Sequence, residues 1–227
     1  MFFMKFKGNC RHSSGLFTDA VSPVVGVMLM LTLVIILAAV VSAFAGGIAG
    51  NSDPGSLIEI TAETKIINSG DADTSKFEID ILSVSSPVST KDMELKTSWK
   101  TYVDDKLVLK GNSSEAGIKN FDYDDIEGVS PIGTGPGLPE WDRSYENIEE
   151  EMNFGNYALL AGTRMAAYPA DEYVGGAYSA GHSGTDCMQA VLGDDWYKLQ
   201  SGDIVSVMLI HVPSGQIIYD DDVYVNS

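Results

Sequence analysis

The stretch that decides the organisation of this chain is residues 24–50, VVGVMLMLTLVIILAAVVSAFAGGIAG. Its only polar side chains are Thr32 and Ser42, whose hydroxyls can bond to carbonyls of the preceding helical turn. As a helix it would be roughly 40 Å long, whereas the hydrocarbon core of a bilayer is about 30 Å thick. A helix buried in a small soluble domain is apolar along one side rather than all round. The stretch therefore predicts a hydrophobic helix that enters a membrane.

Charged residues are distributed unevenly along the chain. The 227 residues include 14 basic and 32 acidic ones, for a formal net charge of −18, yet none lies between Ala20 and Ser52. Residues 1–19 hold three of the basic residues and one acidic residue, so the remainder has 11 basic and 31 acidic residues and a net charge of −20. This surplus repels phosphate backbones and argues against nucleic-acid binding. It suits a domain that faces water, including salty water.

Three kinds of N-terminal segment have an apolar stretch near the start of the chain. A cleavable secretory signal peptide is disfavoured, because its apolar core normally runs about 7 to 15 residues. An ordinary signal anchor would keep Lys5, Lys7 and Arg11 on the cytoplasmic side. A prepilin-type leader would instead be cut before the apolar stretch, and the helix would be retained.

The residues around the start of the stretch favour the prepilin-type leader. Residues 19–27 read DAVSPVVGV, and they are followed by MLM and by an apolar run that ends in Phe44 and Gly46. Over residues 19–47 this order resembles the N-terminal signature of archaeal type IV pilins, A-V-S-P-V-[IV]-G-V. Bacterial type IV pilins have a Glu near the start of the mature helix, and this chain has none between Ala20 and Ser52. That difference fits the archaeal family, but it removes the usual salt bridge to the N-terminal amine as an account of subunit registry.

The resemblance implies a processing site and a set of partners. A prepilin peptidase would cut the bond between Asp19 and Ala20, or as a second choice the bond between Ala20 and Val21. Residues 1–19 would then be a cytoplasmic leader, and the helix of residues 20–50 would lie in membrane lipid before it joins a surface filament. The family also implies copies of the chain or related pilins, an assembly ATPase and a membrane platform as partners, and adhesion as the role of the filament.

The chemistry of helices agrees with retention of residues 20–50. Ser22 is a natural N-cap, and the missing N–H of Pro23 costs nothing in a first turn. Gly26 leaves a small face through which neighbouring helices can approach. At roughly 25 cal/mol per Å², several hundred Å² buried per subunit would contribute on the order of 10 kcal/mol before association costs. The positions that we expect to serve assembly are Ser22, Pro23, Gly26, Leu31, Ile35 and Phe44.

Beyond a linker at residues 51–55, residues 56–227 have the pattern of an exported β-rich head domain. Alternating apolar and polar residues predict strands in residues 56–67 and 76–82 and a shorter candidate in residues 101–110. Residues 203–212 and 216–225, joined by a Pro-Ser-Gly turn, predict a C-terminal hairpin. The acidic residues 144–155 are a candidate for a short helix. The predicted fold class is α+β, a long N-terminal hydrophobic helix followed by an antiparallel β-sandwich-like domain.

The head domain offers few groups for chemistry, and the sequence predicts neither an enzyme nor a cofactor. Residues 182–187 contain a His, an Asp and a Cys, but catalytic triads are assembled from separate elements, so we interpret this segment as a polar loop. Asp71, Asp73 and Ser75 place oxygen atoms at alternating positions, as calcium loops do. They lack the Gly and the Glu of an EF-hand, and solvated acidic turns are the better interpretation.

Two further features concern covalent chemistry. The sequon NSS at residues 112–114 makes Asn112 either a glycosylation site or an unmodified surface residue. Cys10 lies in the predicted leader, so Cys187 would be the lone thiol of the mature chain and no intramolecular disulfide is expected.

Four tyrosines are concentrated in one Gly-rich stretch and could serve an adhesive patch, a subunit contact or the core: Tyr157, Tyr168, Tyr173 and Tyr178. Two functions therefore fit the sequence. The first is a filament subunit, major or minor, that polymerises through its N-terminal helix. The alternative is a membrane-anchored extracellular binding protein that uses the same export route and does not polymerise.

Overall fold

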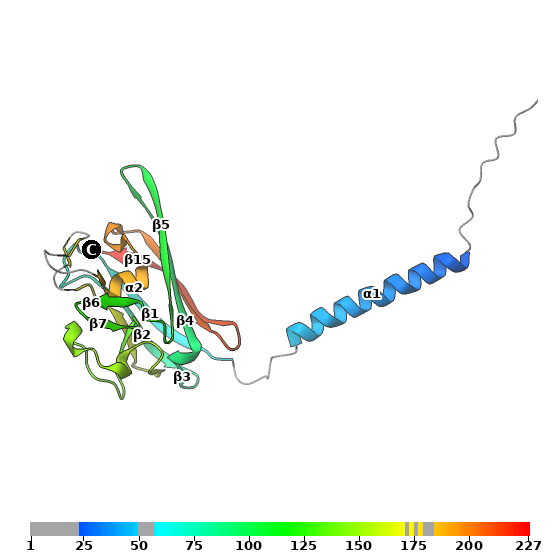
Figure 1. Cartoon of the computed structure of the whole chain (residues 1–227), viewed down its shortest axis with the longest axis horizontal. Coiled ribbons are helices and arrows are strands. Elements are labelled where there is room, and N and C mark those ends of the chain that lie inside the picture. The colour runs from blue at the N-terminus through cyan, green and yellow to red at the C-terminus, as the bar shows by residue number, and fades with distance from the viewer. Residues whose placement is uncertain (1–22, 50–56, 171–172, 175–176, 179–183) are drawn as a thin grey trace, which may run out of the picture. The chain divides into compact units, whose positions relative to one another are not determined.

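The computed structural model in Figure 1 describes residues 23–49, 57–170, 173–174, 177–178 and 184–227. The chain divides into two compact units, Met1–Asp53 and Pro54–Ser227. In the first unit, α1 spans Pro23–Ala49, and no acidic residue lies in its first turn and no basic residue in its last. Side chains of α1 are described for residues 25–38. Within the described residues, no helix combines the length and the hydrophobicity that crossing a membrane requires.

The second unit is the head domain, and an eight-stranded sheet forms its frame. Neighbouring strands are antiparallel, except that β1 and β15 run parallel where Ile66 pairs with Val225. In spatial order the strands are β5 (Lys106–Glu115), β4 (Met93–Val103), β14 (Ile204–His211), β15 (Gln216–Asn226), β1 (Ile60–Ile67), β2 (Lys76–Val84), β10 (Arg164–Ala167) and β8 (Ile132–Thr134).

Smaller elements make up the rest of the head domain. A three-stranded sheet has the order β13 (Gly184–Thr185), β6 (Phe121–Tyr123), β7 (Ile126–Gly128), and the short helix α2 spans Cys187–Leu192. Two-stranded pairs join β3 (Val88–Ser89) to β9 (Ala158–Leu159) and β11 (Tyr173–Val174) to β12 (Ala177–Tyr178). The 3₁₀ turns are η1 (Thr90–Asp92), η2 (Tyr145–Asn147), η3 (Glu150–Met152) and η4 (Trp196–Lys198).

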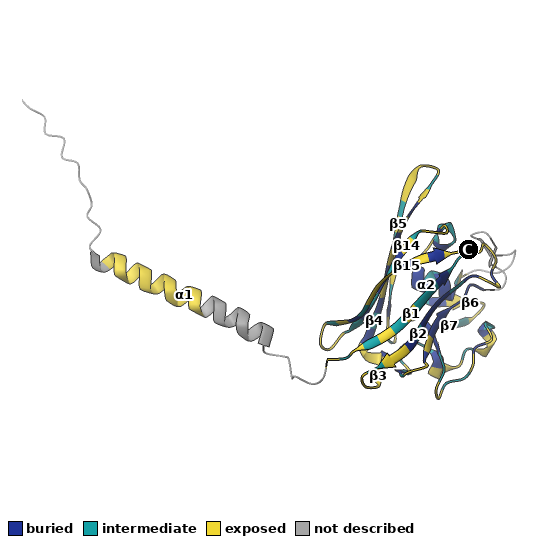
Figure 2. Ribbon diagram, turned by 180° about the vertical axis from the view of Figure 1, so that it is seen from behind, coloured by how far each residue is buried: buried dark blue, intermediate teal, exposed yellow. Residues whose placement is uncertain are grey.

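The large sheet has one covered face, which we call the inner face, and one open face, which we call the outer face. Burial along β4 alternates strictly, since Leu95, Thr97 and Trp99 are buried while Lys96 and Ser98 lie on the other side. Successive side chains of a strand point to opposite faces, so this alternation separates the two faces. The covering layer on the inner face includes α2, which contacts both β4 and β5 and also β6 (Figure 2).

The core of the head domain lies between the inner face and this covering layer. Aromatic residues are prominent in it, and Phe121, Tyr123 and Trp141 all contact the ring of Tyr145, with centroid distances of 5.1 to 6.2 Å. Edge-to-face and tilted contacts at such distances are favourable for aromatic pairs. The largest fully buried side chains include Phe77, Phe121, Phe154, Ile66, Ile79, Ile81, Met93 and Leu95.

The structure confirms the antiparallel β-rich head domain and its C-terminal hairpin, in which Val205 pairs with Val223. The shorter candidate at residues 101–110 is the tip of a much longer hairpin, which turns at Asp104 and Asp105 with φ angles of 49° and 60°. Residues 144–155 form two 3₁₀ turns rather than one short α-helix. In the described part of the chain, the layer over the inner face is a helix with small sheets and loops instead of a second large sheet.

Helix α2 was not predicted from the sequence, although local signals mark both of its ends. Asp186 is the N-cap and accepts a hydrogen bond from the amide of Gln189, whose side chain in turn accepts from the Asp186 amide. This is a capping box, and Gly193 follows the last turn with a φ of 84°. A helix of only six residues carries too weak a periodicity to stand out from the Gly-rich sequence around it.

Candidate functional site

The described part of α1 exposes apolar side chains around its whole circumference. Residues 25–38 are all exposed, and the exposed fraction of the large apolar ones runs from 47% for Val25 to 70% for Met30. Leu31 and Ile35, two predicted assembly positions, are 57% and 58% exposed. The hydroxyl of Thr32 donates to the carbonyl oxygen of Leu29, so the polar group in this surface is bonded within the helix. A contiguous apolar surface of this kind marks contact with protein or lipid.

Gly26 lies in this surface and leaves a gap in it. A Cβ atom built on Gly26 would meet no heavy atom within 4 Å outside its own helix. Within α1 as described there is therefore room for a side chain at this position.

The predicted processing residues Asp19, Ala20 and Val21 and the predicted N-cap Ser22 lie outside the described residues. Pro23 is the first residue of α1, at the position where proline suits a helix. Phe44 lies within α1, and its side chain is outside the described set.

A cation of the chain itself occupies the loop that was a calcium candidate. The guanidinium of Arg143 donates hydrogen bonds to the carbonyl oxygens of Ala72 (2.9 Å), Ser75 (2.6 Å) and Asp73. An Asp71 carboxylate oxygen accepts from the amide of Asp73 at 2.9 Å. Three carbonyls that could ligate a metal thus accept from an arginine. Among the residues that the structure describes, no group of three or more His, Cys, Asp or Glu is placed to hold a metal ion.

Arg143 also lies over the ring of Tyr168, 4.2 Å from its centroid, in a cation–π contact. Tyr168 is 7% exposed and its hydroxyl donates to the Glu78 carboxylate at 2.8 Å. Burial works to raise the pKa of Glu78, but hydrogen bonds from Lys76 and Tyr168 outweigh it and the pKa is lowered. Tyr157 is likewise buried, so the adhesive interpretation is wrong for Tyr157 and Tyr168. The side chains of the other two tyrosines in that stretch are outside the described set.

The sequon residue Asn112 lies on β5, and it helps to hold α2 on the sheet. Its side-chain amide donates a hydrogen bond to the carbonyl oxygen of Ala190 at 2.8 Å. The hydroxyl of Thr97 donates to the carbonyl oxygen of Val191 at 2.5 Å. The indole N–H of Trp99 donates to the carbonyl oxygen of Leu192 at 2.7 Å. Three consecutive carbonyls at the C-terminus of α2, which have no partner within the helix, are therefore satisfied by β4 and β5. A glycan on Asn112 would leave one of its two amide hydrogens for the bond to Ala190.

The thiol of Cys187, the one cysteine among the described residues, lies in a buried polar cluster at the start of α2. The Cys187 amide donates to the hydroxyl of Tyr145 at 2.8 Å, and the hydroxyl of Ser130 donates to the Cys187 carbonyl at 3.2 Å. Burial raises the pKa of the thiol, so it is an unreactive structural cysteine. Burial also raises the pKa of Asp186 to about 7, and its Oδ2 has no hydrogen-bond partner among the described residues.

His182 is outside the described residues, and His211 contacts Ser214 in the β14–β15 turn.

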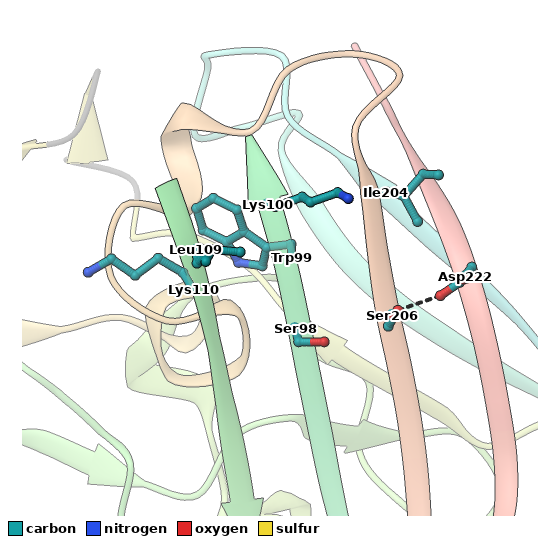
Figure 3. A pocket seen from close by; sticks show the side chains of 8 residues that line it. All are labelled: Ser98, Trp99, Lys100, Leu109, Lys110, Ile204, Ser206 and Asp222. Atoms are coloured by element: carbon teal, nitrogen blue, oxygen red, sulfur yellow. Dashed lines mark hydrogen bonds between the residues drawn. The ribbon is translucent and has the colours of Figure 1, made fainter. Parts of the chain in front are cut away.

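The outer face carries a groove that sequence reasoning missed. It has a volume of about 610 Å³ and lies across β5, β4, β14 and β15, with Leu109, Lys100, Ile204 and Asp222 along its length (Figure 3). Ser98 and Ser206 contribute small side chains to it, and the hydroxyl of Ser206 donates to Asp222. A second hollow of about 400 Å³ shares these two serines and continues along the same strands. The alternation in residues 93–102 could have assigned residues to this face, but not the strand order that brings them together.

Two comparisons with known proteins bear on these residues. Residues 19–55 match the family model described as archaeal type IV pilin, N-terminal, a segment that includes the predicted processing residues and α1. A search of curated proteins found no match for the chain. Residues 19–55 are therefore similar to the N-terminal region of archaeal type IV pilins, and the resemblance predicted from the sequence is confirmed.

Proposed function

We propose that the chain is a structural subunit, major or minor, of an archaeal type IV pilus-like surface filament. The observation that carries this proposal is the all-round apolar surface of residues 25–38 within a segment that matches the pilin family. The alternative, a membrane-anchored binding protein that uses the same export route, would share this segment but would not form filaments. The role is structural rather than enzymatic, and the head domain is displayed for adhesion.

Maturation would begin with a prepilin peptidase that cuts between Asp19 and Ala20, or between Ala20 and Val21. The retained helix would first be a single-pass segment in the cell membrane, with lipid around its apolar surface. An assembly ATPase and a membrane platform would then transfer the subunit into the filament at the cell surface. Copies of α1 would replace lipid around each helix, so the apolar surface stays out of water in both places.

Mass spectrometry of the N-terminal peptide in material sheared from the surface of the native host tests this proposal. We expect a peptide that starts at Ala20 or Val21 and retains the hydrophobic helix. A start at Met1, or recovery with membranes alone, would favour the alternative of a membrane-anchored binding protein. A start near residue 51 would indicate an ordinary signal peptide and would overturn the proposal.

Gly26 provides a test of the filament core. Gly26→Arg should abolish sheared filaments, because a long charged side chain cannot enter a contact between closely packed apolar helices. Gly26→Ala is the matched control, and it should be processed normally, since the chain has free space at this position. Wild-type filament yield from Gly26→Arg, measured by quantitative immunoblotting of the sheared fraction, would mean that Gly26 faces no neighbouring helix.

A further inference from the structure

The β4–β5 hairpin extends beyond the strand beside it. Pairing of β14 with β4 ends where Val205 meets Trp99, whereas pairing of β4 with β5 continues to Val103 and Lys106. Residues 100–109 thus form a two-stranded ribbon, and Figure 1 shows its tip projecting past the rest of the sheet. A two-stranded ribbon in water is marginally stable unless another surface packs on it.

Exposed apolar side chains gather on the outer face of this ribbon and on the strands next to it. On the ribbon, Tyr102 pairs with Leu107, and Leu109 lies opposite Lys100. On the neighbouring strands, Ile204 pairs with Tyr224. Leu109 and Ile204 both line the groove. Exposed fractions are 63% for Tyr102 and Tyr224, 66% for Leu109, 49% for Leu107 and 41% for Ile204. We call these five side chains the ribbon patch. Exposed apolar groups on adjacent strands form one surface, and surfaces of this kind mark contacts with other molecules.

Charge is segregated within the head domain. Residues 93–115, which make the hairpin, hold four lysines and four acidic residues, a net charge of zero, and four of the eleven basic residues that follow residue 19. Residues 120–151, which we call the acidic layer, hold ten acidic residues and only Arg143 as a basic one, a net charge of −9. The acidic layer includes β6 and β7, which lie across α2 from β4 and β5 in Figure 1. The ribbon patch and the acidic layer therefore belong to opposite sides of one domain.

The two exposed lysines of the ribbon can pair with exposed carboxylates of the acidic layer. Lys100 and Lys106 are exposed and flank the patch, and the exposed Asp104 and Asp105 form the turn at the tip of the ribbon. In the acidic layer, Asp122, Glu146 and Glu150 are exposed. The acidic layer also has partly buried apolar side chains that can meet the patch, among them Ile126 and Ile148. Opposite charges across an interface set its register and exclude wrong pairings, while apolar burial supplies affinity.

We propose that the ribbon patch of one subunit docks on the acidic layer of a second copy of this chain. The contact is heterologous, since two different surfaces meet, and it repeats from copy to copy as a helical filament requires. Contact between two ribbons would bring together the same surface of both subunits and would close after two subunits. The inference rests on the proposed filament function and assigns the head-to-head contact within that filament.

A zero-length carbodiimide cross-link tests this contact, because it joins a lysine amine to a carboxylate only where the two touch. Treated wild-type filaments should give a ladder on denaturing gels, and mass spectrometry should find Lys100 or Lys106 linked to a carboxylate within residues 120–151. In one subunit β6 and β7 lie across α2 from β4 and β5, so a link between these elements joins two copies. A ladder that lacks these links, or that joins the lysines to other regions, would overturn the proposal.

Charge reversal provides an independent measurement. Lys100→Glu with Lys106→Glu should remove the ladder and lower the temperature at which filaments dissociate, whereas the exposed control Lys91→Glu should leave both unchanged. Adding Glu149→Lys and Glu150→Lys to the double variant should restore both, and this rescue excludes misfolding as the cause. If the double variant behaves as wild type, the inference fails while the filament function stands. If wild-type chain is processed but never found in filaments, both fail.

Discussion

Asp186 is a buried carboxyl group whose proton makes the stability of the head domain depend on pH. Its pKa is about 7 in the folded chain because of burial, against about 3.9 for an unfolded Asp. The folded state therefore binds more protons than the unfolded state between these values, and the contribution of Asp186 to stability falls as pH rises from 4 to 8. Tyr145 and Cys187 lie beside it, and both have raised pKa values, so they stay neutral over this range.

Asp186→Asn should flatten this dependence. The amide keeps the acceptor that caps Gln189 and resembles the protonated acid, so the variant should match wild type at pH 4 and exceed it by about 1 to 3 kcal/mol at pH 8. Tryptophan-fluorescence unfolding of the full chain in mild detergent measures this difference. The pKa values of three other carboxyl groups are lowered, those of Glu78, Asp80 and Glu94, so their contributions to stability are lost as pH falls. These contributions are the same in wild type and in Asp186→Asn, so they do not affect the difference between the two. The exposed control Asp92→Asn should show no such difference, and equal stability of wild type and Asp186→Asn at pH 8 would contradict the assignment.

Arg143 holds the turn at residues 72–75 by hydrogen bonds, although the backbone of Arg143 is itself in an unfavourable conformation. Its φ of 78° is left-handed, which a long side chain rarely adopts, and its hydrogen bonds to the turn carbonyls offset that cost. Arg143→Lys cannot reproduce the planar fork and should lower the free energy of unfolding by about 1 to 3 kcal/mol.

Thermal unfolding of the full chain in detergent checks this prediction, with the exposed Lys91→Gln as control. Because Arg143 already bonds to the carbonyls of this turn, millimolar calcium should not shift the midpoint of the wild-type chain. A clear upward shift with calcium would instead support a metal site at Asp71, Asp73 and Ser75.

At the scale of elements, α2 depends on the sheet for its existence. Six residues are far fewer than the 12 to 15 or so that an isolated helix needs in water. Its terminal carbonyls are satisfied by Thr97, Trp99 and Asn112, which belong to strands about eighty to ninety residues away in sequence. This long-range capping lets a short helix cover the inner face.

Thr97→Val should lower the free energy of unfolding by about 1 to 3 kcal/mol, because valine has the same shape but leaves the Val191 carbonyl buried without a donor. Thr61→Val, at an exposed position of β1, is the matched control and should have little effect. Hydrogen exchange of the Ala190 and Gly193 amides, which bond within α2, should accelerate in Thr97→Val alone. Equal stability of the two valine variants would show that the capping bond contributes nothing.

For the whole molecule, net charge is the property with the widest effect. A net charge of −20 after residue 19 means that folding brings like charges together in the head domain. Ion pairs such as those of Arg164 with Asp80 and Lys198 with Asp195 neutralise only a part of the acidic residues. Salt screens exposed charges over about 10 Å at 0.1 M and about 3 Å at 1 M.

The thermal midpoint of the full chain should therefore rise between about 0.1 M and 1 M sodium chloride. Screening also weakens single ion pairs, but we expect the relief of net repulsion to be the larger effect. Scanning calorimetry of the chain in detergent checks this, with an uncharged osmolyte at matched osmolarity to separate screening from exclusion. A midpoint that stays constant or falls with salt would mean that specific ion pairs outweigh the net repulsion.

Local patterns in the sequence determined the features whose physical cause is itself local. The leader motif and the apolar stretch are read from about thirty consecutive residues, and the C-terminal hairpin from two alternating runs around one turn. The proposed function depends on these parts, so it could be inferred from the sequence before the structure.

Only the tertiary structure decided the features that join distant residues. Arg143 bonds to a turn some seventy residues earlier, Thr97 and Trp99 cap a helix more than ninety residues later, and the groove combines β4 and β5 with β14 and β15. The partner of each such group is set by strand order and register, which depend on how the whole sheet packs rather than on neighbouring residues. The helix that we propose for assembly was therefore visible in the sequence, whereas the surfaces by which heads would touch appeared only in the fold.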